Sequence, residues 1–123
     1  MSYETHFWGQ FEIAPALPSD VVAELSSRIA TDWGHAASQS ISGRPDAPCH
    51  WEPAPDGRAL RWDECAKFYD YERWLRVLID EFFAPRGHVL NGSVRYSGEG
   101  DADEGIIRVE ANRVMLAELP PTW

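Results

Sequence analysis

The segment from Val89 to Leu119 constrains the fold most strongly, because it predicts three β-strands joined by two short turns. Leu90 and Tyr96 share one face of the first predicted strand, and Ile107 starts the apolar face of the second. Asn112 supplies the second turn, since asparagine tolerates the backbone conformations that tight turns require. Three consecutive strands favour an antiparallel meander at this end of the chain.

The first of these turns carries a dense cluster of carboxylates. Residues 98–105 read Gly-Glu-Gly-Asp-Ala-Asp-Glu-Gly and are followed by the apolar pair Ile106-Ile107. Acids so close together are rarely buried, so this cluster is expected at an exposed sheet edge or loop. Its members are Glu99, Asp101, Asp103 and Glu104.

The acidic cluster does not match a calcium-binding loop. A loop that begins at Asp101 would need glycine at its sixth position and glutamate at its twelfth. Ile106 and Asn112 stand at those positions instead. We interpret the cluster as a solvated acidic turn, which also discourages aggregation of the sheet.

The rest of the chain predicts one more strand, two helices and a hairpin. Residues 7–13 alternate as a half-buried strand, and a helix capped by Ser19 or Asp20 extends toward Trp33. Residues 50–52 and 59–62 predict two short strands around the turn Pro55-Asp56-Gly57. The second helix has a continuous apolar stripe and Asp70 as its N-cap. The stripe consists of Tyr71, Trp74, Leu75, Leu78, Ile79 and Phe82.

These elements predict a single α+β domain over residues 1–123. The expected architecture is an antiparallel sheet of five or six strands, ending in the meander, with two helices packed on one face. The segment from His35 to Pro48 is rich in Ser, Ala, Gly and Pro and predicts a long surface loop.

The charge balance restricts the classes of partner. The 123 residues contain 11 Lys and Arg against 20 Asp and Glu, which gives a formal net charge of −9. This balance opposes direct binding to nucleic acid or to an anionic membrane, and it favours a protein partner with a basic surface. The N-terminal residues lack the pattern of a secretory signal, and no apolar run could span a bilayer, so a cytoplasmic location is expected.

The sequence offers no recognisable catalytic or cofactor motif. Cys49 and Cys65 lack the paired spacing of zinc sites, and the adjacent Cys49-His50 is an awkward chelate, so no metal is expected. No serine lies in a nucleophile elbow, and no glycine-rich loop has the phosphate-binding pattern. We therefore predict no enzymatic activity and no cofactor. An enzyme would require a pocket that holds His35 or His50 beside Cys49.

Several aromatic residues could stack against a flat ligand or single-stranded nucleic acid. They are Trp8, Trp51, Trp62 and Tyr96. In the predicted first strand Trp8 lies on the face opposite to Phe7, so it is the best candidate for an exposed ring. Trp62 and Trp74 are expected in the core.

Several stretches of the chain resemble a family of small uncharacterised domains from actinobacteria and their phages. They are Phe7 to Leu17, Trp51-Glu52-Pro53, Asp56 to Asp63, Lys67-Phe68-Tyr69 and Val89 to Gly100, with the acidic turn and Val109 to Val114 behind the last. In that family the last run ends in an Asp-rich turn and a final short hairpin. The resemblance covers roughly three quarters of the chain and leaves out the loop from His35 to Pro48. It implies a phage or prophage origin as one option beside a chromosomal one, and it transfers no catalytic residues.

Charge, size and resemblance together predict a non-enzymatic interaction protein. Its sharpest form is an anti-CRISPR-like inhibitor whose acidic face occupies the basic nucleic-acid channel of a host protein. The alternative is an accessory module that binds a small molecule or peptide through exposed aromatics. The residues predicted to bind the partner are Glu99, Asp101, Asp103 and Glu104, with Glu110 and Glu118 expected nearby and Trp8 as an aromatic anchor.

Overall fold

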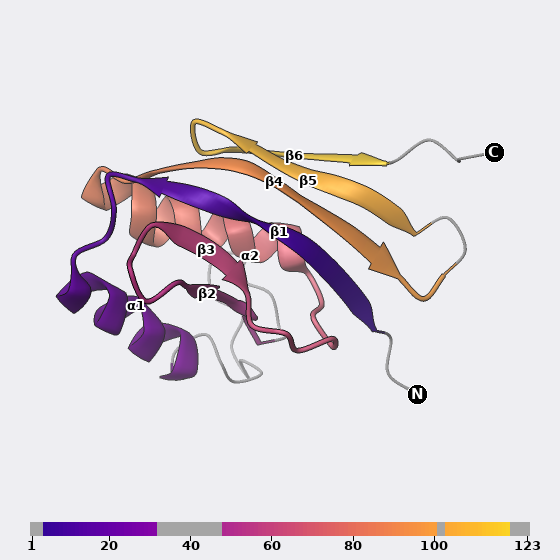
Figure 1. The fold of residues 1–123 in the computed structure, drawn as a ribbon, viewed down its shortest axis with the longest axis horizontal. Coiled ribbons are helices and arrows are strands. Elements are labelled where there is room, and N and C mark those ends of the chain that lie inside the picture. The colour runs from indigo at the N-terminus through magenta and orange to yellow at the C-terminus, as the bar shows by residue number, and fades with distance from the viewer. Residues whose placement is uncertain (1–3, 32–47, 101–102, 119–123) are drawn as a thin grey trace.

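The computed structural model describes residues 4–31, 48–100 and 103–118. These residues form a six-stranded antiparallel sheet with two helices, which confirms the predicted α+β fold (Figure 1). The predicted loop from His35 to Pro48 lies outside the described residues except for Pro48. The strands are β1 (Thr5–Ala14), β2 (Trp51–Pro53), β3 (Ala59–Trp62), β4 (Val89–Gly98), β5 (Glu104–Glu110) and β6 (Arg113–Glu118), and the helices are α1 (Ser19–Thr31) and α2 (Tyr71–Leu78).

The strand order in the sheet is β2-β3-β1-β4-β5-β6. The last three strands form the predicted meander. The N-terminal strand β1 lies in the interior of the sheet and pairs with β4 along its whole length, from Thr5 opposite Gly98 to Ala14 opposite Val89 (Figure 1). On its other side β1 pairs with β3. The sheet is therefore completed by the pairing of strands that are far apart in sequence.

One face of the sheet forms the core. Phe11, Leu60, Leu90 and Ile107 come from four different strands, and all four are fully buried on this face. Helix α2 lies across the sheet, behind β1 and β3 in Figure 1, and α1 packs beside β2. Leu25 of α1 joins the same core. Burying this apolar face of the sheet is the main force that holds the layers together.

Helix α2 follows the predicted apolar stripe but ends differently from a regular helix. After Leu78 the chain widens into a π-helical turn, Ile79–Phe83, and then tightens into a 3₁₀ turn, Ala84–Arg86. Phe82 and Phe83 stay buried across this change, so the stripe remains in contact with the sheet. Asp70 is the N-cap residue of α2, as predicted, but it adopts a left-handed conformation and its side chain makes no capping hydrogen bond. None of the described helices is long and apolar enough to cross a bilayer.

The turn between β2 and β3 requires its glycine. Gly57 has a positive φ of 72°, and a Cβ atom there would lie 2.2 Å from the carbonyl oxygen of Leu17. The Gly57 carbonyl also accepts a hydrogen bond of 2.8 Å from the Leu17 N–H. The predicted turn at Pro55-Asp56-Gly57 therefore also anchors the connection between β1 and α1.

Candidate functional site

Acidic residues gather at the end of the sheet where β4 turns into β5. Glu99 follows β4 and is exposed, and Glu104 begins β5. The β1–β4 pairing brings Glu4 to the same end, where its backbone N–H donates a hydrogen bond to the Glu99 carboxylate. Asp103 closes the turn, because its carbonyl oxygen accepts a hydrogen bond of 2.7 Å from Gly98. We call Glu4, Glu99, Asp103 and Glu104 the acidic end.

The predicted acidic residues do not all lie together. Glu110 pairs with Arg113 at the opposite end of β5. At about 3.4 Å per residue this places it roughly 20 Å from Glu104, so the prediction of proximity is wrong for Glu110. Glu118 lies opposite Gly105, which brings its backbone to the acidic end. Asp101 lies outside the described residues.

Trp8 lies on the face of the sheet opposite the core, as predicted. Its side chain is 54% exposed, whereas Phe7 beside it in sequence is buried. In the β1–β4 pairing Trp8 lies opposite Arg95, and the Arg95 guanidinium reaches the Glu104 carboxylate at 3.9 Å. The exposed ring and the acidic end therefore belong to one continuous surface.

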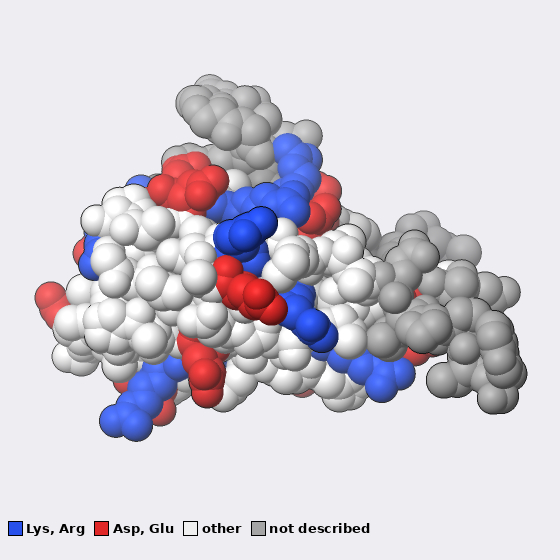
Figure 2. Space-filling view, turned by 90° about the horizontal axis from the view of Figure 1, so that it is seen from above, with Lys and Arg blue, Asp and Glu red and all other residues white. Residues whose placement is uncertain are grey.

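The open face of the sheet also collects arginines that are scattered in the sequence. The strand pairings place Arg61, Arg95, Arg108 and Arg113 on the same face as Trp8. Figure 2 shows Lys and Arg side chains gathered across the middle of the molecule, with acidic side chains between and around them. Arg61 is paired with Glu52 at 3.1 Å. This open face is therefore mixed in charge, although the chain as a whole is acidic.

Of the four aromatic residues considered for a stacking platform, three are buried, so they do not form an exposed platform. Trp51 is fully buried, and Trp62 and Tyr96 are also in the core, where rings from several elements pack around Phe7. Trp8 alone of that set is exposed. The predicted core positions of Trp62 and Trp74 are confirmed.

A second cluster of polar side chains lies at the open end of the β2–β3 hairpin, away from its turn at Gly57. The Asp63 N–H donates a hydrogen bond of 2.9 Å to the His50 carbonyl, which extends the hairpin by one pair. The same register brings His50 Nδ1 within 2.8 Å of Asp63 Oδ2. Asp63 Oδ1 accepts a hydrogen bond of 2.8 Å from the Cys65 N–H. One donor atom from each of His50, Asp63 and Cys65 lies within 4.8 Å of the other two.

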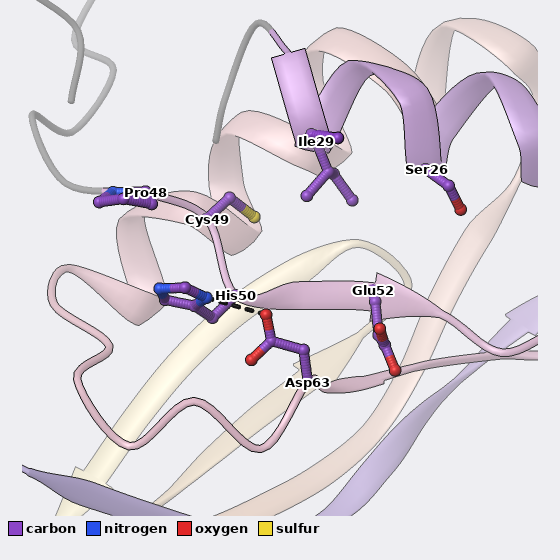
Figure 3. Close-up of a pocket in the computed structure, with 8 residues that line it drawn as sticks. Ser26, Ile29, Pro48, Cys49, His50, Glu52 and Asp63 are labelled. Carbon is purple, nitrogen blue, oxygen red and sulfur yellow. Dashed lines mark hydrogen bonds and ion pairs between the residues drawn. The ribbon is translucent and has the colours of Figure 1, made fainter. Parts of the chain in front are cut away.

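A hollow of about 320 Å³ opens beside this cluster. Ser26 and Ile29 of α1 form one side of it, and His50, Asp63 and Glu52 form the other (Figure 3). The hollow holds His50 beside Cys49, the arrangement that an enzyme reading of the sequence would need, whereas His35 lies outside the described residues.

Cys49 is nevertheless a poor nucleophile. It is almost fully buried, and its thiol donates a weak hydrogen bond to the Trp51 carbonyl oxygen at 3.8 Å. Burial raises the pKa of the Cys49 thiol to about 12. Because only the thiolate attacks electrophiles, Cys49 is inert near neutral pH.

The sequence contained a signal for the second cluster that motif spacing alone does not reveal. Asp63 and Cys65 are separated by one residue, Glu64, which has a positive φ of 74°. Extending the predicted pairing of residues 50–52 with 59–62 by one residue places His50 opposite Asp63. A search for paired cysteines and histidines misses this combination because His50 precedes β2, whereas Asp63 and Cys65 follow β3.

Three comparisons with known proteins found no match for the chain. No family model matches it, and neither a curated protein nor a solved structure does. The resemblance to small actinobacterial and phage domains therefore stays a prediction.

Proposed function

We propose that this chain is a non-enzymatic interaction protein that docks on a protein partner with a basic surface. The observation that carries the proposal is the connection of Trp8, through Arg95, to Glu104 of the acidic end. An exposed tryptophan supplies apolar contact area, and neighbouring carboxylates supply charge complementarity. The two features lie on one surface, so a single partner can contact both.

The distribution of charge supports docking by one end rather than by the whole surface. Four arginines lie on the open face with Trp8, whereas the acidic end brings the carboxylates of Glu99 and Glu104 to one end of the sheet. A partner groove lined with Lys and Arg would therefore receive the β4–β5 turn first. If that groove normally holds DNA or RNA, occupation by the acidic end inhibits the partner by competition, as an anti-CRISPR-like protein would.

The test is capture of a partner from a bacterial lysate on the tagged protein, followed by elution in steps of rising salt and mass spectrometry. Salt release of one nucleic-acid-handling protein is the expected result, because exposed ion pairs weaken as salt rises. Purified partner is then titrated against a variant with Glu99→Gln, Asp103→Asn and Glu104→Gln. We expect binding to weaken at least tenfold, with a nearly unchanged melting temperature.

A charge-matched variant controls for net charge. Asp20→Asn, Glu64→Gln and Asp80→Asn remove the same three charges from exposed positions outside the acidic end. This variant should bind the partner as the unaltered protein does. Equal weakening in both variants would show that overall charge acts rather than the acidic end, and intact binding in the first variant would refute the proposal.

A second candidate function is binding of a small molecule or peptide at Trp8. A shallow hollow on the open face, lined by Ser93, Arg108 and Glu110 among others, favours it. Ser93 lies opposite Gln10, two residues from Trp8 on the same face. In this case a ligand should raise the melting temperature of the protein and of the acidic-end variant equally, and Trp8→Ala should abolish the effect. Loss of the effect in the acidic-end variant would exclude this function.

A further inference from the structure

We propose that His50, Asp63 and Cys65 bind a zinc ion. This inference is independent of partner binding, because the cluster belongs to the β2–β3 hairpin and not to the acidic end. An imidazole nitrogen, a carboxylate oxygen and a thiol sulfur converge there, with all three donor atoms within 4.8 Å of one another. A set that contains both sulfur and nitrogen selects zinc over calcium or magnesium, which prefer oxygen.

The spacing of the donor atoms is close to what zinc requires. Zinc–nitrogen and zinc–oxygen bonds of about 2.0–2.1 Å and a zinc–sulfur bond of about 2.3 Å imply donor separations of roughly 3.3–3.7 Å in a tetrahedral site. The His50 Nδ1 to Asp63 Oδ2 separation of 2.8 Å must widen slightly. Zinc takes the place of the proton between these two atoms. A neutral His50 then carries its single ring proton on Nε2, and the proton that is released comes from the Cys65 thiol.

The backbone holds these side chains in place before any ion arrives. Asp63 is fixed by its N–H bond to the His50 carbonyl, and its Oδ1 accepts the Cys65 N–H. The Cys65 carbonyl accepts a hydrogen bond of 2.8 Å from the indole N–H of Trp62. The His50 ring packs edge-on against Phe68, with 5.3 Å between the ring centroids. Because the ligands are already ordered, binding costs little conformational entropy.

The hollow supplies access to the fourth coordination position. His50 and Asp63 both line it, and their side chains point toward one another at its wall (Figure 3). Glu52 also lines it, but its carboxylate is held by Arg61. Three protein ligands leave one position for water or a small ligand, as in zinc sites that are open to solvent.

The experiment uses tag-free protein that has been treated with a chelator and dialysed. Zinc chloride is titrated into it by calorimetry, and cobalt chloride is added to a parallel sample. We expect one zinc ion per chain and, with cobalt, the near-ultraviolet absorption of a cobalt–thiolate bond. Cys65→Ser should remove that absorption and weaken zinc binding at least tenfold, and His50→Gln should weaken zinc binding to a similar extent.

Cys49→Ala is the matched control, because Cys49 is the neighbouring thiol but lies outside the cluster. It should keep both the cobalt–thiolate absorption and the zinc affinity. Circular dichroism checks that every variant is folded. If Cys65→Ser does not fold, Cys65→Ala replaces it in the same measurements. Absence of zinc binding in the unaltered protein, or equal affinity after loss of Cys65, would overturn the proposal. If Cys49→Ala alone lost the absorption, the metal-bound thiolate would belong to Cys49 and not to Cys65, and this result would also overturn the proposal.

Discussion

Tyr96 lies directly opposite Gly105 in the β4–β5 pair, and its ring fills the space above the glycine. A Cβ atom at residue 105 would lie 2.5 Å from the Tyr96 hydroxyl oxygen and 2.6 Å from the Ala117 carbonyl oxygen. Both separations are shorter than real Cβ atoms allow. The acidic end is therefore held by a tyrosine–glycine pair at its base, which couples its position to the core.

Replacing Gly105 by alanine should destabilise the fold. The new methyl group must displace the Tyr96 ring or the β6 backbone, and overpacking of this kind costs about 1–3 kcal/mol. Urea unfolding followed by circular dichroism measures the loss. In a Tyr96→Leu background the added cost of Gly105→Ala should shrink, because the ring is gone. The same loss in both backgrounds would contradict the role of the pair.

Asn112 should contribute more to stability than a turn residue that only shapes the backbone. Its Oδ1 accepts a hydrogen bond of 2.7 Å from the Leu90 N–H, and its Nδ2 donates to the His88 carbonyl at 3.1 Å. It also has a positive φ of 68°. Asn112→Ala loses both bonds and strains the backbone, so thermal unfolding should show a loss of about 2–3 kcal/mol.

Two further substitutions separate the causes. Asn112→Gly keeps the backbone conformation and loses only the side-chain bonds, so its loss should be smaller than that of Asn112→Ala. Asn91→Ala removes one bond to the Ala111 N–H at an exposed position and should cost about 1 kcal/mol or less. If Asn112→Gly were as damaging as Asn112→Ala, backbone strain would play no part.

Burial of Cys49 makes stability depend on pH in the alkaline range. Its pKa rises from 9.0 in the unfolded chain to about 12 in the fold, mainly because burial disfavours the thiolate. Above pH 9 the unfolded chain loses this proton while the folded chain keeps it. The contribution to stability is therefore complete below pH 9 and falls between pH 9 and 12 by up to about 1.4 kcal/mol per pH unit.

Comparison with Cys49→Ala separates the contribution of the Cys49 thiol to stability from that of other groups that titrate at high pH. In Cys49→Ala, unfolding in urea at several pH values above 9 should show a shallower decline than in the unaltered protein. Both proteins are measured with a chelator present. Identical slopes would mean that the Cys49 thiol is accessible to deprotonation in the fold. Alkylation at pH 8 gives a second check, since Cys65 should react while Cys49 does not.

Asp63 should stabilise the hairpin even without metal. Its carboxylate contacts both His50 and the Cys65 N–H at 2.8 Å. In the presence of a chelator, Asp63→Ala should cost about 1–3 kcal/mol, because the Cys65 N–H loses its acceptor. Asp63→Asn keeps one acceptor oxygen and should cost less. Glu64→Gln, at the exposed neighbouring position, should leave the unfolding free energy unchanged within about 0.5 kcal/mol.

Local sequence patterns determined the elements of this fold and the exposure of their residues. The apolar stripe from Tyr71 to Phe82, the turns at Gly57 and Asn112, and the alternation that exposes Trp8 are all properties of neighbouring residues. Helix periodicity, strand alternation and turn conformation depend on interactions over a few residues, so they can be predicted from the chain alone. Asp70 shows the limit, since it occupies the predicted N-cap position without making the side-chain hydrogen bond that its residue type favours there.

Only the tertiary structure decided which strands lie side by side. The pairing of β1 with β4 brings Arg95 opposite Trp8, and the register of β2 with β3 sets His50 against Asp63. Pairing between distant strands is chosen by the apolar area that the whole sheet buries, and no local window of sequence contains that sum.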